Sequence, residues 1–106
     1  MREDVTFSTN RGALTASLKC EIDHHTARRM REKIDGELFL CKPNVLILDF
    51  SAVRFMDSSG IGLILGRTER AVAVGATVRL TGLSDTLYKL IRLSGLERVK
   101  NLSVTR

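Results

Sequence analysis

The chain has 106 residues, of which 43% are hydrophobic and 27% charged, and its formal net charge is +5. This composition is typical of one folded domain and excludes a disordered or fibrous chain. No apolar stretch reaches the length of about 18 residues that a membrane-spanning helix needs, and residues 1–4 lack the apolar core of a signal peptide. We therefore expect a single domain over residues 1–106 that stays in the cytoplasm.

Two short strands are predicted at the start of the chain. Residues 4–9 alternate between polar and apolar side chains, and this period of two indicates a half-buried strand. A turn at 10–12 separates it from a second strand over 13–20, in which every second residue is apolar. The pair is expected to form an antiparallel hairpin.

A first helix is predicted after Asp23, which is a suitable N-cap residue. Apolar residues then recur at spacings of three and four, which is typical of one buried helical stripe. The members of this stripe are Ala27, Met30, Ile34, Leu38 and Cys41. Pro43 and Asn44 end the helix and lead into the next strand.

The stretch 45–66 dominates the chain. It opens with a nearly continuous apolar run over 45–50, which indicates a strand buried on both faces. Three good N-cap residues follow, Asp57, Ser58 and Ser59, so a second helix is predicted from near Ser58 to about Val74, with Gly75 as its C-cap. Its buried side is expected to consist of Ile61, Ile64, Leu65, Ala71 and Val72.

Three glycines lie in the first turns of this second helix. Gly60, Gly62 and Gly66 each cost about 1 kcal/mol relative to alanine in a helix. Their presence suggests that another backbone approaches closely, which the sheet or a partner would supply.

The remaining elements complete an α/β pattern. A strand is predicted over 77–81, a helix from the cap Ser84 to Gly95, and a last strand over 99–104. The order is therefore strand, strand, helix, strand, helix, strand, helix, strand. This order predicts a mixed sheet of about five strands with a mostly parallel centre and with helices packed on it. The inward side chains of the third helix are expected to be Leu87, Leu90 and Ile91.

The connection before the second helix is a candidate site. It follows the carboxyl end of a central strand, where open α/β sheets usually bind ligands or partners. A serine hydroxyl at a helix N-terminus faces unpaired backbone N–H groups, so a phosphate added there meets an anion-binding environment. Simple helix capping also explains Asp57, Ser58 and Ser59. A catalytic role for Asp57 lacks a histidine or second acid nearby in the sequence.

A second polar group precedes the first helix and consists of Glu21, Asp23, His24 and His25. A capped loop with two solvated histidines explains it locally. Neighbouring histidines are expected to point in different directions, which disfavours a metal pair. A zinc site that adds Cys20 lacks an evident fourth ligand, so Cys20 and Cys41 are expected to be free and half-buried.

Two further interpretations are that the chain binds a dinucleotide or a nucleic acid. The spacing of Gly60, Gly62 and Gly66 loosely resembles a dinucleotide fingerprint, but the connection from the strand is too long for its tight turn. A local basic cluster, Arg28, Arg29, Arg31 and Lys33, has no interleaved aromatic residues for stacking nucleic-acid bases. A solvated helix face or a surface for an acidic protein partner is the favoured interpretation of the cluster.

Two segments carry a family resemblance. Residues 55–62, Phe-Met-Asp-Ser-Ser-Gly-Ile-Gly, resemble the phosphorylation segment of the bacterial anti-sigma factor antagonists of the STAS-domain family, and most closely those of the sporulation type. Residues 21–27 are similar to a second family segment, and the likeness extends from about Val5 to Val104. The resemblance implies the STAS fold.

The resemblance also implies a function in which the chain is a binding module and not an enzyme, with no cofactor and no metal. Ser58 would be the phosphoacceptor, with Ser59 as the competing acceptor. The unphosphorylated form would bind a cytoplasmic anti-sigma factor that is also a serine kinase, and would so release the sigma factor. Phosphorylation by that kinase, with its bound ATP, would break the complex, and a serine phosphatase would restore it. The implied partner-binding residues are Asp23, Asp57, Ser58, Ser59, Gly60, Ile61 and Gly62.

The chain departs from the family at two points. Cys20 stands where the family often has glycine before the acid, so the turn after the second strand is expected to differ. The chain stops at Arg106, where relatives commonly continue into a further helix, and the absence of that helix would expose part of one surface. Two other functions stay open: a STAS scaffold that works without phosphorylation, and a small nucleotide-binding protein. Neither a nucleic acid nor a membrane is an expected partner.

Overall fold

A five-stranded mixed sheet organises the chain, and the computed structural model describes residues 3–106 of it. The strands lie in sequence order, with β1 antiparallel to β2 and all other neighbours parallel. This arrangement confirms the predicted α/β fold and the predicted order of elements. The strands are β1 (Val5–Asn10), β2 (Ala13–Leu18), β3 (Val45–Asp49), β4 (Thr77–Thr81) and β5 (Leu102–Val104). The helices are α1 (His24–Cys41), α2 (Ser58–Ala73), α3 (Asp85–Ser94) and the short 3-10 helix η1 (Leu96–Arg98).

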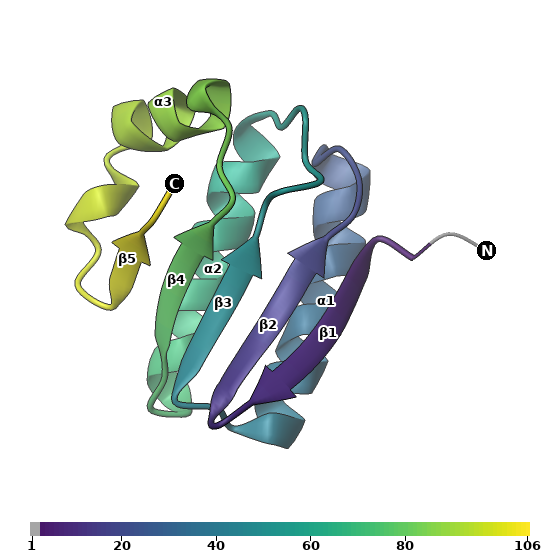
Figure 1. The fold of residues 1–106 in the computed structure, drawn as a ribbon, viewed down its shortest axis with the longest axis vertical. Helices are drawn as coiled ribbons and strands as arrows, with labels where there is room; N and C mark the ends of the chain where they lie inside the picture. The colour runs from purple at the N-terminus through teal and green to yellow at the C-terminus, as the bar shows by residue number, and fades with distance from the viewer. Residues whose placement is uncertain (1–2) are drawn as a thin grey trace.

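The helices α1 and α2 lie side by side on one face of the sheet (Figure 1). The carboxyl ends of β2, β3 and β4 meet at one edge, which is the upper edge in Figure 1, and α3 lies at that edge. Both α1 and α2 therefore begin at the edge where their preceding strands end. Among residues 3–106, no helix has the length and apolar character needed to cross a membrane.

The core lies between the sheet and the pair α1 and α2. Alternate strand residues, such as Leu14, Leu46 and Leu80, are fully buried against the helices. The prediction that the central strand is buried on both faces is wrong, because Val45 and Ile47 of β3 are only half-buried. Their side chains point to the other face of the sheet, since successive residues of a strand alternate between faces, and Figure 1 shows no helix on that face.

The buried stripe of α1 is confirmed at its centre, where Met30, Ile34 and Leu38 are buried. Ala27 is half-buried, and Cys41 is exposed instead of half-buried. Cys41 is the last residue of the helix, where α1 has passed the end of the core. Cys20 is half-buried as predicted, and both thiols are free.

The predicted buried side of α2 is partly wrong. Ile64 and Ala71 are buried, but the exposed fractions of Leu65 and Val72 are 42% and 66%. The face toward the core repeats at spacings of three and four and consists of Gly60, Leu63, Ile64, Arg67, Thr68 and Ala71. Arg67 and Thr68 lie on this buried face. A prediction from hydrophobicity alone therefore placed part of the buried face on the wrong side of the helix.

The largest differences between predicted and observed strand boundaries are in β2 and β5. The strand β2 ends at Leu18, before Cys20, and one further hydrogen bond, from the Lys19 N–H to the Asp4 carbonyl, extends its pairing with the start of the chain. The last strand begins at Leu102 instead of Val99, because η1 and a turn occupy residues 96–101. In α3, Leu87 and Ile91 are buried, and Leu90 is half-buried.

The buried carboxylate of Asp4 holds the start of the chain against α1. Its ion pair makes the stability of the fold sensitive to acid. Asp4 accepts a hydrogen bond of 2.6 Å from Nε of Arg29 and a weaker one from the Cys20 thiol. The bond from Arg29 lowers the pKa of Asp4 below its ordinary value of 3.8. The folded state therefore favours the charged form, and the stabilisation is complete above pH 3.8 and is lost as the pH falls through the lowered pKa.

The variant Asp4→Asn tests this pair. At pH 7 it is expected to have a smaller free energy of unfolding than the unmodified protein, because the ion pair is absent. The difference is expected to shrink as the pH falls toward 2, measured by urea denaturation at each pH. A difference that stays constant down to pH 2 would contradict the role assigned to Asp4.

Candidate functional site

The candidate site is the place where the loop before α1 meets the loop before α2. The Ile22 N–H donates to the Phe55 carbonyl at 3.0 Å, and the Asp57 N–H donates to the Ile22 carbonyl at 3.0 Å. These bonds form an isolated parallel bridge between Ile22 and Met56, whose side chains are both buried. The two segments singled out in the sequence are therefore tied together, and the starts of both helices lie next to each other.

Asp57 is the N-cap of α2, since its side chain accepts a 2.8 Å hydrogen bond from the Ser59 N–H. Ser58 is the first residue of the helix and is exposed, whereas Ser59 is half-buried. Ser58 is thus exposed to solvent at the positive end of a sixteen-residue helix. The position suits an enzyme-accessible acceptor, and a negative group added there would meet a favourable dipole.

Asp23 has the equivalent position at the start of α1. Its side chain accepts hydrogen bonds from the backbone N–H groups of His25 and Thr26, and the Thr26 hydroxyl accepts one from the Asp23 N–H. This is a capping box. The hydrogen bond from the Thr26 backbone, with a further one from His25, holds the pKa of Asp23 below its usual range. Because Ile22 and Met56 are paired, Asp23 and Asp57, which follow them directly, cap two neighbouring helix starts.

The two histidines differ from expectation. The rings of His24 and His25 lie against each other with their centroids 4.0 Å apart, instead of pointing in different directions. Both residues are exposed on the first turn of α1. Within residues 3–106, no three His, Cys, Asp or Glu side chains gather closely enough to hold a metal ion. The Cys20 thiol considered as a zinc ligand instead donates to Asp4.

The glycines of α2 have different surroundings. A Cβ on Gly60 would lie 2.5 Å from Sδ and 3.2 Å from Cβ of the buried Met56, so Gly60 lets the loop before the helix pack closely. A Cβ on Gly62 or Gly66 would meet nothing within 4 Å. The close approach inferred from the sequence therefore exists only at Gly60, and it comes from a side chain instead of a backbone. Gly62 and Gly66 leave open space.

This difference predicts opposite effects of two alanine substitutions. Gly60→Ala is expected to lower the free energy of unfolding by about 1–3 kcal/mol, because Met56 must move in a packed core. Gly62→Ala is expected to raise it by up to about 1 kcal/mol, because the added methyl improves helix propensity without a contact. Thermal and urea denaturation of both variants measure the effects. Equal destabilisation by both would contradict this account of the helix start.

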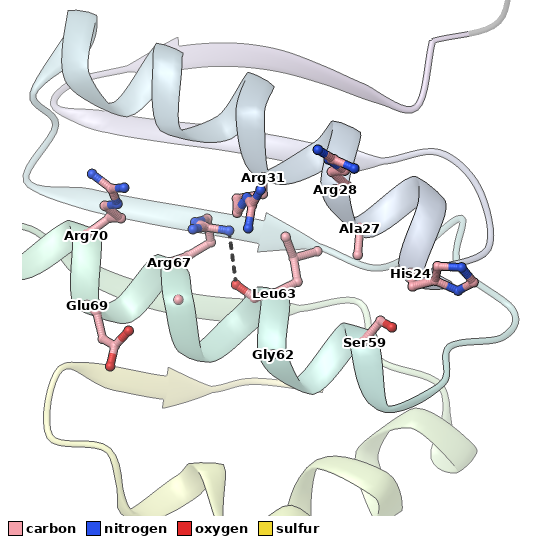
Figure 2. Close-up of a pocket in the computed structure, with 11 residues that line it drawn as sticks. His24, Ala27, Arg28, Arg31, Ser59, Gly62, Leu63, Arg67, Glu69 and Arg70 are labelled. Carbon is pink, nitrogen blue, oxygen red and sulfur yellow. Dashed lines mark hydrogen bonds between the residues drawn. The ribbon is translucent and has the colours of Figure 1, made fainter.

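A groove between α1 and α2 runs from this site along the two helices (Figure 2). Its volume is about 600 Å³. The residues that line it and that the site prediction omitted are His24, Ala27, Arg28, Arg31, Leu63, Gly66, Arg67, Glu69 and Arg70. The sequence holds a usable signal for it: Gly62, Gly66 and Arg70 recur at intervals of four and so share one face of α2. Ser59 lies at the end of the groove near His24 (Figure 2).

The glycines do not form a dinucleotide site. The strand β3 ends at Asp49 and α2 begins at Ser58, so the connection is longer than a phosphate-binding turn. Gly60, Gly62 and Gly66 all lie within the helix, where they cannot form the turn that carries a dinucleotide pyrophosphate.

The fold and the site together define a class. The chain is an α/β domain that presents an exposed serine at the start of a helix, beside a second capped helix start, at the edge of a mixed sheet. Residues 4–106 match the STAS domain, and the chain belongs to this family. The resemblance drawn from residues 55–62 is thereby confirmed at the level of the family and the fold.

Similar proteins carry names that refer to sigma-factor control. A protein of Lysinibacillus sphaericus named anti-sigma F factor antagonist is 38% identical over 76 residues, which are 72% of this chain and 65% of that protein. One of the same name from Paenibacillus polymyxa is 29% identical over 99 residues, which are 93% of this chain and 85% of that protein.

Solved structures agree with this likeness. The phosphorylated Bacillus cell fate determinant SpoIIAA superposes with a TM-score of 0.71 at 31% identity, over 96% of this chain and 91% of that one. The unphosphorylated form of the anti-sigma factor antagonist SpoIIAA superposes with a TM-score of 0.72 at 28% identity, over 96% and 87%.

Proposed function

We propose that this protein is an anti-sigma factor antagonist whose binding is switched by phosphorylation of Ser58. The unmodified form would bind a cytoplasmic anti-sigma factor that is also a serine kinase, and the bound sigma factor would be released. Transfer of the ATP γ-phosphate to the Ser58 hydroxyl would end the complex, and a serine phosphatase would restore the starting form. The chain would supply the acceptor hydroxyl and the surface, and its partners the catalysis.

The observation that carries the proposal is the exposed position of Ser58 on the first residue of α2. A kinase needs access to the hydroxyl, and Ser59, the competing acceptor, is half-buried. The names of the similar Lysinibacillus and Paenibacillus proteins, and the existence of a phosphorylated SpoIIAA, support the same function.

Local charge supplies a reason for the switch. A phosphoserine carries a charge of about −1.5 to −2 at neutral pH. It would be added directly after Asp57, and the loop that carries Asp57 is hydrogen-bonded to the loop that carries Asp23, whose pKa is lowered. Three negative groups on one docking surface would repel acidic groups of a partner and would be costly to desolvate. The proposed docking surface consists of Asp23, Asp57, Ser58, Ser59, Gly60, Ile61 and Gly62, and the buried Gly60 would act in it through its backbone.

The test is phosphate transfer from a kinase-type anti-sigma factor of the same organism. The protein is incubated with that kinase and Mg-ATP, and the phosphate is located by mass spectrometry. We expect one phosphate on Ser58, an unchanged yield with Ser59→Ala, and no transfer with Ser58→Ala. Label on Ser59 alone, or no label at all, would overturn the proposal, and the latter result would favour a STAS scaffold that works without phosphorylation.

A further inference from the structure

The groove between α1 and α2 is positively charged, and the proposed function of Ser58 assigns no role to this charge. Arg28 and Arg31 approach it from α1, and Arg67 and Arg70 from α2 (Figure 2). Glu69 is the single acidic residue in the lining, and Figure 2 shows its carboxylate pointing away from the arginines of α1. The groove therefore presents guanidinium groups from two sides.

Most of these guanidinium groups are available to a ligand. Within residues 3–106, Arg31 forms no ion pair, and Arg28 reaches Glu32 only at 4.0 Å with both side chains largely exposed. Arg70 lies 3.8 Å from Asp35 and is also largely exposed. The charge of Arg67 is different, because it is buried and is balanced by Asp35 at 2.7 Å. Arg28, Arg31 and Arg70 thus form the usable charge of the rim.

The floor of the groove is open because two residues of α2 lack side chains. Neither Gly62 nor Gly66 has a neighbour within 4 Å in the direction where a side chain would point. A ligand can therefore approach the helix backbone while its acidic groups reach the arginines on either side. An extended peptide fits this shape, since a row of carboxylates would face Arg28 and Arg31 on one side and Arg70 on the other.

Other anionic ligands fit less well. A nucleotide would require an apolar or aromatic slot for its base, and the apolar lining consists of Ala27, Leu63 and the two glycines. A nucleic acid would require a broad basic face with stacking aromatics, and no aromatic ring other than His24 lines the groove. The shape and the charge favour a protein segment rich in Asp and Glu.

We infer that the groove between α1 and α2 binds an acidic segment of a protein partner. This inference rests on the proposed function in one respect: it identifies that partner with the anti-sigma factor, because the groove is continuous with the start of α2 where Ser58 lies. The groove then determines which anti-sigma factor is recognised, and the loop at Ser58 determines when it is released.

The first test uses a hexaglutamate peptide and the isotope-labelled protein in NMR titrations. We expect the largest shift changes at the amides of Ala27, Gly62 and Gly66, and a loss of affinity as salt rises from about 50 mM to about 300 mM. The double variant Arg28→Glu/Arg31→Glu is expected to bind the peptide at least tenfold more weakly, since two attractive contacts become repulsive.

The matched control is Arg98→Glu/Lys100→Glu, which changes the net charge by the same amount at exposed positions outside the groove. We expect this variant to bind the peptide within about twofold of the unmodified protein, because local contacts outweigh the overall field. Equal weakening by both double variants, or shift changes away from the groove, would overturn the inference. ATP binding in the groove more tightly than the peptide would also overturn it, in favour of a small-anion site.

The second test repeats the two double variants with the kinase-type anti-sigma factor used in the phosphate-transfer experiment. We expect the groove variant to weaken that complex at least tenfold and the control to preserve it. If the unmodified protein fails to bind any anti-sigma factor, the proposed function fails, while the peptide titration still decides whether the groove binds an acidic segment. If the unmodified protein binds and the groove variant binds equally well, the inference fails and the proposed function stands.

Discussion

The variant Ser58→Asp is expected to bind the anti-sigma factor at least tenfold more weakly than the unmodified protein, a loss of about 1.4 kcal/mol. The reason is the charge that it adds directly after Asp57, at the place where the loop that carries Asp23 is hydrogen-bonded to the loop before α2. The variant Ser58→Ala is expected to bind like the unmodified protein and to stay active permanently, since it cannot accept phosphate. Isothermal titration calorimetry with the purified kinase measures both affinities.

The fold itself is expected to tolerate the aspartate. An acidic side chain in the first turn of a helix is stabilising by about 0.3–1 kcal/mol, because it faces the positive end of the helix dipole. The melting temperature of Ser58→Asp is therefore expected to match or slightly exceed that of the unmodified protein. Loss of binding with an intact melting temperature would identify repulsion at the surface as the cause. An Asp variant that binds as tightly as the unmodified protein would show that charge is not the switch.

The variant Asp35→Ala is expected to lower the free energy of unfolding by about 3 kcal/mol and the melting temperature by roughly 10–20 °C. Arg67 is only 2% exposed, and burial lowers its pKa because the charged form loses its hydration. Asp35 balances that charge, with its Oδ1 2.7 Å from Nε and its Oδ2 3.2 Å from a terminal nitrogen of Arg67. Without the carboxylate, the guanidinium would be buried between α1 and α2 with no opposite charge.

Arg67→Met serves as the matched variant for this pair. Methionine has a similar length and fills the buried space, and the remaining carboxylate of Asp35 is partly exposed and lies near Arg70. We expect Arg67→Met to cost less than Asp35→Ala, and the double variant to be more stable than Asp35→Ala alone. Chemical denaturation of the three variants measures this. A loss below about 1 kcal/mol for Asp35→Ala would contradict the importance of the pair.

The Asp35–Arg67 pair shows where prediction from the sequence stops. The five strands, the three caps Asp23, Asp57 and Ser84, and the order of elements along the chain follow from local patterns, and the structure confirms them. The buried face of α2 could not be predicted from local patterns, because the hydrophobic character of Leu65 and Val72 predicted that both are buried. A buried arginine becomes tolerable only through an acid on another helix, and no local pattern reveals that partner.

Some features of the candidate site could be predicted from the sequence, and others could not. The exposed serine after a capping aspartate could be predicted, because N-cap preference is a local property. The bridge between Ile22 and Met56, which brings the two helix starts together, joins residues far apart in the sequence and lies outside the register of β2 and β3. The groove depends on which face of α2 turns toward α1. Both features therefore required the three-dimensional structure.

The most direct measurement of the proposed switch is the release of sigma factor from a preformed complex with its anti-sigma factor. We expect the unmodified protein, added in excess, to liberate free sigma factor, which size-exclusion chromatography would separate from the complex. The same protein carrying one phosphate on Ser58 is predicted to leave the complex intact. Equal release by the two forms, or no release by either, would contradict the account.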